Sequence, residues 1–112
     1  MAFDSEMMRG VVEPIVLRLV TERARYGYEI IKVVNERTDG AFAWKEGTLY
    51  PCLHRLEAAG LVTGEWRESE SGKARKYYAI TRKGAALLKA KSQEWSAFAG
   101  AVNAVLCPGA PA

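Results

Sequence analysis

Residues 47–60 read GTLYPCLHRLEAAG, and this stretch decides how the rest of the sequence is interpreted. Leu49, Leu53 and Leu56 recur at intervals of four and three residues, which places them on one face of a helix. The stretch therefore predicts a helix over residues 47–59 with one apolar side.

The ends and the polar side of this predicted helix carry further signals. Pro51 is expected in its first turn, where a missing N–H costs little, and Gly60 suits the left-handed position that closes a helix. The face opposite the leucines presents Thr48, Tyr50, Pro51, His54, Arg55 and Ala58. Because a polar face on a packed helix is free to meet a partner, it is a candidate surface for recognition.

Two short strands are predicted directly after this helix, over residues 61–68 and 75–81. Alternation puts Val62 and Trp66 on one face of the first strand, and Tyr78 in the core register of the second. The residues between the strands are polar and rich in turn formers. The pattern is typical of a β-hairpin, and its tip and second strand are basic.

The charge of the chain is concentrated on this hairpin. Lys and Arg number 16 and Asp and Glu 13 among 112 residues, which gives a net charge of +3. Residues 67–83 hold six of the basic and two of the acidic side chains, so this segment carries +4 and the other 95 residues carry −1. Such a segment favours contact with an anionic polymer, although a solvated, charged turn is the alternative.

A long helix is predicted at the C-terminal end of the chain, over residues 82–106, with Thr81 as its cap. It would span about 37 Å, which is more than so small a domain needs. The apolar side chains that follow a heptad spacing along it are Leu88, Trp95, Phe98, Val102 and Val105. A stripe of this kind usually faces another helix, so these residues are predicted to form a dimer interface.

Two further helices are predicted upstream. Apolar residues recur with helical spacing between residues 5 and 22, and the helix is regular from Glu13 onward. A second helix follows residues 26–28 and ends at Asp39-Gly40. Residues 41–44 alternate in size and favour a short extended piece.

The order of these elements is that of a winged helix-turn-helix, in which the third helix enters the major groove and the hairpin lies along the DNA backbone. We therefore expect an α+β, mainly helical fold, with three helices, a β-hairpin wing and a long C-terminal dimerisation helix. The expected division is a DNA-binding domain at residues 1–84, a dimerisation helix at 85–107 and a disordered tail at 108–112.

Composition excludes several other classes of protein. Hydrophobic residues make up 49% and charged residues 26% of the chain, which is ordinary for a globular domain. No apolar run approaches the roughly 18 residues of a membrane helix, and the first residues lack the apolar core of a secretory signal. Two cysteines and one histidine argue against a disulfide framework and a metal site. We expect a cytoplasmic protein without a cofactor and, since no catalytic constellation is visible, without enzymatic activity.

Four blocks of the sequence resemble the PadR-like family of transcriptional regulators. The blocks are YGYEI at 26–30, GTLYPCLHRLE at 47–57, GLV at 60–62 and KARKYYAITRKG at 73–84. Together with Arg9-Gly10 and the terminal helix, the resemblance extends over about residues 8–106. Four spaced blocks in the expected order are a specific signal, whereas any one of them alone would be weak.

The resemblance implies a homodimeric bacterial regulator, usually a repressor, that binds a palindromic operator. It implies that the C-terminal helix makes the dimer with help from the N-terminal helix. It also implies that effectors, where they exist, are small aromatic or cationic amphipathic compounds. A winged-helix module that binds another protein without binding DNA is the alternative, because one fold serves many functions.

Nine residues are candidate contacts to double-stranded DNA. Hydroxyl and guanidinium groups near the two middle helices can meet phosphates or base edges, and wing cations can meet phosphates. The candidates are Tyr26, Tyr28, Thr48, Tyr50, Pro51, Arg55, Lys73, Arg75 and Lys76. Three alternatives stay open: Thr48 could cap its helix, Pro51 could merely set the helix start, and the tyrosines could pack inside the domain.

Trp95 is the candidate ligand-binding residue on the terminal helix. It resembles the tryptophan with which multidrug-binding relatives sandwich flat ligands, and the small residues Ser92 and Ala99 could leave space beside it. The alternative is that Trp95 belongs to the interface core. Cys52 and Cys107 are expected to be inert, because nothing near them in sequence marks a reactive thiol.

Overall fold

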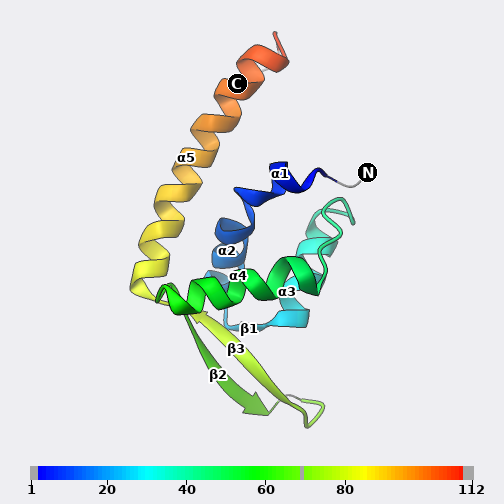
Figure 1. Cartoon of the computed structure of the whole chain (residues 1–112), viewed down its shortest axis with the longest axis vertical. Coiled ribbons are helices and arrows are strands. Elements are labelled where there is room, and N and C mark those ends of the chain that lie inside the picture. The colour runs from blue at the N-terminus through cyan, green and yellow to red at the C-terminus, as the bar shows by residue number, and fades with distance from the viewer. Residues whose placement is uncertain (1–2, 69, 110–112) are drawn as a thin grey trace.

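The computed structural model describes residues 3–68 and 70–109. Its elements follow the predicted order, with one additional helix and one additional strand (Figure 1). They are α1 (Ser5–Arg9), α2 (Val12–Glu22), β1 (Arg25–Tyr26), α3 (Gly27–Arg37), α4 (Glu46–Ala58), β2 (Val62–Glu68), β3 (Ala74–Ile80) and α5 (Arg82–Leu106). The fold is α+β and mainly helical, as predicted.

The core lies where α2, α3 and α4 meet the sheet. The three leucines of α4 that the sequence pattern predicted to be buried, Leu49, Leu53 and Leu56, are fully covered. Leu17 of α2 and Ile30 of α3 pack in the same cluster. Burying one such side chain contributes about 1.5–3 kcal/mol. These contacts therefore hold one face of α4 inward and leave the other outward.

Of the two predictions for the ends of α4, the one for Gly60 is confirmed and the one for Pro51 is wrong. Because the helix begins at Glu46, Pro51 is its sixth residue and lies inside it, not in its first turn. The proline lacks the N–H that would bond to the carbonyl one turn earlier. Gly60 has the predicted left-handed conformation, with φ of +74°. Beside it, the Leu61 N–H donates to the Leu56 carbonyl at 2.9 Å, which closes the helix.

The sheet has three antiparallel strands in the order β1-β3-β2. β2 and β3 form the predicted hairpin, in which Val62 pairs with Ile80. The sequence did not reveal β1, because a strand of two residues is too short to show alternation. In it, Tyr26 pairs with Tyr77. The central strand β3 therefore links the hairpin to the start of α3.

The hairpin of β2 and β3, called the wing below, extends beyond the helical body (Figure 1). Val62 and Tyr78 lie near its base and are buried, in agreement with the predicted register. Trp66 follows the same alternation as Val62 but is 69% exposed. At Trp66 the strand extends beyond the hydrophobic core, so no core residue covers this side chain.

The helix predicted over residues 5–22 is divided into α1 and α2. The chain leaves α1 at Gly10, and α2 begins after Val11. Pro14 then falls in the first turn of α2, where its missing N–H is tolerated. The break is local and does not alter the apolar face that α2 packs into the core.

The extended piece predicted over residues 41–44 is wrong, because this segment is an irregular loop. Ala43 has a positive φ of 50°, which lies outside the β region. The Asn35 side chain holds the loop: its amide accepts from the Trp44 N–H at 2.8 Å and donates to the Trp44 carbonyl at 3.0 Å. Trp44 is thereby buried, and the loop leads directly into α4.

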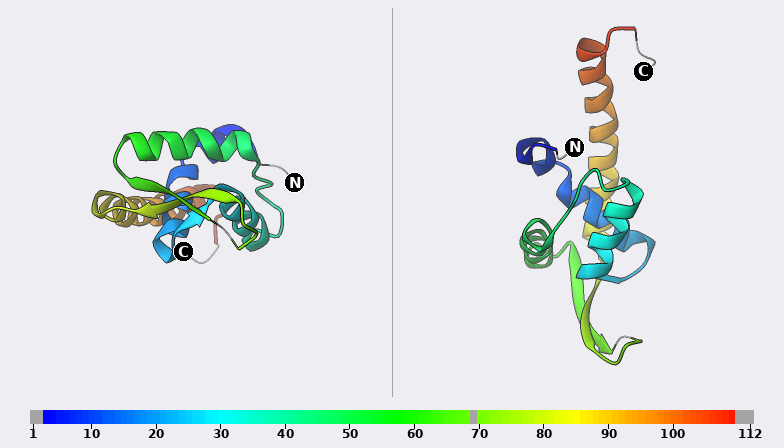
Figure 2. Two further views of the ribbon diagram at one scale, coloured as in Figure 1. Left: turned by 90° about the horizontal axis from the view of Figure 1, so that it is seen from below. Right: turned by 90° about the vertical axis from the view of Figure 1, so that its right-hand side faces the viewer.

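α5 begins with Thr81 as its N-cap, as predicted, and the threonine hydroxyl accepts from the Gly84 N–H at 3.0 Å. The helix then leaves the body and runs to the end of the molecule opposite the wing (Figures 1 and 2). Of the expected disordered tail, residues 110–112 lie outside the described part of the chain. Within the described part, no helix is long and apolar enough to cross a membrane.

Candidate nucleic-acid interface

α4 lies at the surface along one side of the molecule (Figure 2), and its outward face is polar. Pro51, His54 and Arg55 are exposed on this face, and Thr48 is half-buried near its start. The Arg55 Nε lies 3.7 Å from the carboxylate of Glu13 on α2. A long ion pair between two exposed groups is weak. The guanidinium of Arg55 therefore remains able to form an ion pair with a binding partner.

Tyr50 is half-buried between α4 and the start of α3. A Cβ added at Gly27 would collide with the hydroxyl and ring of Tyr50, so the ring occupies the space that this glycine leaves open. Burial raises the pKa of Tyr50. The structure thus assigns Tyr50 the packing role that the sequence left open, and its contact with DNA stays a prediction.

Tyr28 and Glu46 join the start of α3 to the first turn of α4. The Tyr28 hydroxyl donates to the Glu46 carboxylate, and this hydrogen bond raises the pKa of Tyr28. Tyr28 is 55% exposed. A phosphate could reach its hydroxyl from solvent, but it would compete with the carboxylate for the same proton.

The three wing cations that the sequence singled out have different surroundings. Lys73 is exposed beside the turn. Arg75 lies over the ring of Tyr26, with its guanidinium carbon 4.6 Å from the ring centre. Lys76 turns towards α4, where its Nζ lies 2.8 Å from the Glu57 carboxylate, and this hydrogen bond raises the pKa of Lys76. Lys76 is therefore already paired with a carboxylate, whereas no ion pair among the described residues includes Lys73 or Arg75.

The sequence did not single out Arg67 as a contact to DNA, although this residue lies on the wing. Its guanidinium carbon is 4.7 Å from the ring centre of Tyr77. The register of β2 and β3 places it directly opposite Arg75. The charge count over the hairpin included Arg67, but only the strand pairing reveals its neighbour. No ion pair formed within residues 3–68 and 70–109 includes either arginine.

The apolar stripe of α5 is divided between the core and the surface. Leu88 is buried against the body. Further along, Trp95 is 53%, Phe98 60% and Val105 77% exposed, and Val102 is half-buried. The rings of Trp95 and Phe98 are neighbours, with centres 6.2 Å apart. An uncovered stripe of this length is typical of a surface that packs on another helix.

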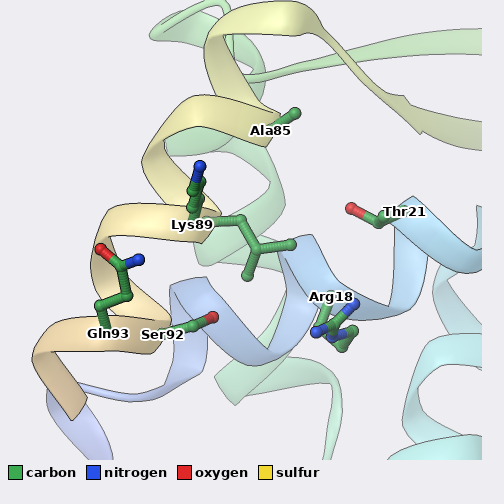
Figure 3. A pocket seen from close by; sticks show the side chains of 7 residues that line it. Arg18, Thr21, Ala85, Lys89, Ser92 and Gln93 are labelled. Atoms are coloured by element: carbon green, nitrogen blue, oxygen red, sulfur yellow. The ribbon is translucent and has the colours of Figure 1, made fainter. Parts of the chain in front are cut away.

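A groove of about 300 Å³ lies between α2 and α5 (Figure 3). It is lined by Arg18, Thr21, Ala85, Leu88, Lys89, Ser92 and Gln93. Of the three predicted ligand-binding residues, only Ser92 lines this groove; Trp95 and Ala99 lie further along α5. This groove therefore does not bring the three residues together.

The thiols and the histidine form no reactive or metal-binding cluster in the part of the chain that the structure describes. Cys52 is fully buried in α4, and burial raises the pKa of its thiol to about 12, which agrees with the expected inertness. Cys107 is exposed just after α5. No group of His, Cys, Asp and Glu side chains among the described residues could hold a metal ion.

The chain is similar to known proteins over most of its length. A profile described as the transcriptional regulator PadR-like family matches residues 16–90. An uncharacterized protein X from Lysinibacillus sphaericus is 40% identical over 92 residues, which are 82% of this chain and 84% of that protein. The transcriptional regulator YqjI from Escherichia coli is 32% identical over 85 residues, which are 76% of this chain and 39% of that protein. The chain thus spans well under half the length of YqjI.

The fold is also shared with solved structures. A transcriptional regulator from Clostridium thermocellum matches with a TM-score of 0.84 and 36% sequence identity, covering 93% of this chain and 98% of that chain. The match therefore includes the three-helix unit, the wing and the long terminal helix.

Proposed function

The chain belongs to the PadR-like family of transcriptional regulators, and from this premise we propose that it binds double-stranded DNA through α4 and the wing. Members of the family are regulators and not enzymes, so family membership confirms the expectation of a non-enzymatic protein. The finer parts of the proposal are a homodimer, a palindromic operator and repression.

The outward polar face of α4 carries this proposal. The buried leucines fix which way the helix faces, so Thr48, Pro51 and Arg55 are presented on a rigid element. An α-helix fits the major groove of B-DNA, which is about 12 Å wide. An arginine there can bind a guanine or a phosphate, and proline can contact a thymine methyl group. The basic wing beside α4 supports a second contact, to the DNA backbone.

The uncovered stripe on α5 supports a dimer. Trp95, Phe98 and Val105 would be buried by the same stripe of a second copy. Because α5 extends away from the wing, such a dimer would leave both copies of α4 and of the wing free (Figure 1). The two α4 helices would then enter successive major grooves, roughly 34 Å apart. The operator would therefore be an inverted repeat.

The exposed indole of Trp95 supports an effector site at the proposed dimer interface. A small aromatic or cationic amphipathic compound would stack on this ring, in space that two copies of α5 would enclose. It would release the operator only if it bound better to the dimer with one spacing of the two wings than with the other.

Selection of binding sites from random-sequence DNA tests the proposal. The full chain should enrich an inverted repeat whose half-sites lie about one helical turn apart. Arg55→Ala should weaken binding to the selected site by about 1–3 kcal/mol and relax the preference at one position. Affinity is measured by gel shift at a fixed salt concentration.

Arg18→Ala provides the matched control, because this arginine is exposed on α2 and faces α5, outside α4 and the wing (Figure 3). It should leave the affinity and the selected sequence unchanged. If no sequence is enriched and the wild-type chain binds random DNA only weakly, DNA recognition is contradicted and the protein-binding module becomes the better explanation.

A further inference from the structure

We propose that Arg67 and Arg75 act together as a binding site for the sugar–phosphate backbone of DNA, on the face of the wing that carries Tyr26 and Tyr77. The inference rests on the proposed DNA binding. It adds which cations of the wing hold the backbone, and it excludes Lys76 from that role.

The register of the wing concentrates positive charge at one point. Arg67 and Arg75 are direct partners across β2 and β3. Like charges directly opposite each other destabilise an antiparallel pair. Two glutamates are available on β2, yet neither Glu65 nor Glu68 stands opposite an arginine. This arrangement does not favour the isolated hairpin, whereas an anion bound between the guanidinium groups would relieve their repulsion.

Two tyrosine rings hold the arginines in place. The guanidinium carbons lie 4.7 Å from the ring centre of Tyr77 for Arg67 and 4.6 Å from that of Tyr26 for Arg75. The two rings touch edge to face, with centres 5.3 Å apart. Stacking orients a guanidinium while its N–H groups stay able to bind a phosphate in bidentate fashion. Within the described chain no carboxylate forms an ion pair with either group.

This face of the wing borders the start of α3, because Arg75 lies over the ring of Tyr26, the N-cap residue of that helix. Arg75 lies near enough to Tyr28 and Tyr50 for its charge to oppose the rise in the pKa of both. Tyr28 in turn bonds to Glu46 in the first turn of α4. In helix-turn-helix proteins the N-terminal residues of the recognition helix contact the bases. Arg67 and Arg75 would therefore meet the backbone that borders the same groove.

Lys76 distinguishes a two-arginine site from the alternative that the wing binds DNA through its net charge alone. It follows Arg75 on the same strand, but its side chain lies on the opposite face and bonds to Glu57 at 2.8 Å. Because this carboxylate already neutralises the ammonium group, Lys76 is not available to displace a counterion from DNA. Removing its charge should leave the salt dependence of binding unchanged.

The salt dependence of DNA binding by the full chain tests the inference. Binding to a fluorescein-labelled duplex of random sequence is followed by anisotropy between about 50 and 200 mM salt. Arg67→Gln and Arg75→Gln should each reduce the slope of log K against log salt by about 0.9, and the double variant by about twice as much. Lys76→Gln removes the same charge from the same hairpin and should keep the wild-type slope.

The double variant Arg67→Lys with Arg75→Lys provides a second readout. It should keep the slope, because the charges remain, but bind more weakly at every salt concentration, because an ammonium group cannot form the bidentate contact. Thermal unfolding of each variant by circular dichroism checks that the domain is folded.

The outcomes distinguish this inference from the function on which it rests. If the wild type binds with a steep slope and both glutamine variants behave like it, the two-arginine site is wrong and DNA binding stands. The same holds if Lys76→Gln lowers the slope as much as the arginine variants do. If the wild type does not bind the duplex, the proposed function fails as well.

Discussion

The ring of Tyr50 on α4 fills the space beside Gly27, the first residue of α3, where a side chain of any other amino acid would collide with it. Glycine is suited to this position because it lacks a side chain and so leaves room for the ring of Tyr50, not because its backbone is more flexible. The contact lies between the two helices of the helix-turn-helix pair. It therefore helps to set the angle at which the polar face of α4 is presented.

Gly27→Ala should destabilise the protein by about 1–3 kcal/mol, because the new methyl group forces the ring of Tyr50 to move. This loss outweighs the better helix propensity of alanine. Gly47→Ala is the control, since the space around Gly47 is open, and it should be neutral or stabilise the helix by up to about 1 kcal/mol. Urea unfolding measures both, and equal effects would contradict the packing role of Tyr50.

Glu22 should make the stability of the fold depend on pH in the acid range. It bonds to Arg37 at 2.6 Å and to Arg25 at 3.0 Å, and chiefly the hydrogen bond from Arg37 lowers the pKa of Glu22 from 4.5 to about 2. Because the pKa is lower in the folded state, the stabilisation is present above about pH 4.5 and is lost as the pH falls towards 2.

Glu22→Gln should therefore lower the free energy of unfolding at neutral pH by about 1 kcal/mol, and the difference from wild type should shrink towards about pH 2. Urea unfolding at a series of pH values gives the comparison. Glu36→Gln is the control, because its contact with Lys32 is 4.0 Å long and exposed. A constant difference at all pH values would show that Glu22 acts by packing and not by charge.

Phe98→Asp should convert the proposed dimer into a monomer, because it puts a charge into the exposed apolar stripe of α5. The domain itself should stay folded, since Phe98 is 60% exposed in the single chain. Ala97→Asp, on a different side of the same helix, is the matched control and should leave the mass unchanged. Light scattering after size-exclusion chromatography measures the mass, and a wild-type monomer would refute the dimer.

Trp95 should report the binding of a flat aromatic cation. Titration with ethidium should quench the tryptophan fluorescence of the chain, and Trp95→Ala should abolish most of the quenching, because the indole is the proposed stacking surface. Trp66→Phe is the control, since Trp66 is exposed on the wing, away from α5. Quenching that survives in Trp95→Ala but is lost in Trp66→Phe would place the ligand elsewhere.

Local patterns in the sequence predicted much of the fold. The three leucines of α4, the left-handed Gly60 and the Thr81 cap all lie where short-range spacing placed them. Two kinds of feature escaped such patterns. β1 owes its existence to pairing with β3, which is distant in sequence. The loop at residues 41–44 is shaped by the two hydrogen bonds between Asn35 and Trp44, not by its own alternation of residue sizes.

The candidate site was predicted as a region, but not residue by residue. The excess of basic residues pointed correctly to the wing as the charged element. Arg67, Arg75 and Lys76 nevertheless have equal charges in the sequence, and nothing local tells them apart. The strand register places the two arginines side by side, whereas a contact with Glu57 on α4 neutralises the lysine.

The sequence by itself determined the order of the elements, the inward face of α4 and the position of the basic segment, because helical spacing, strand alternation and charge are properties of neighbours along the chain. Only the tertiary structure decided which polar groups stay available. The ring of Tyr50 packs into the space at Gly27, and Lys76 forms an ion pair with Glu57. Arg67 and Arg75 stack on tyrosine rings instead and have no carboxylate partner within the described residues. These outcomes depend on contacts between segments that only folding brings together.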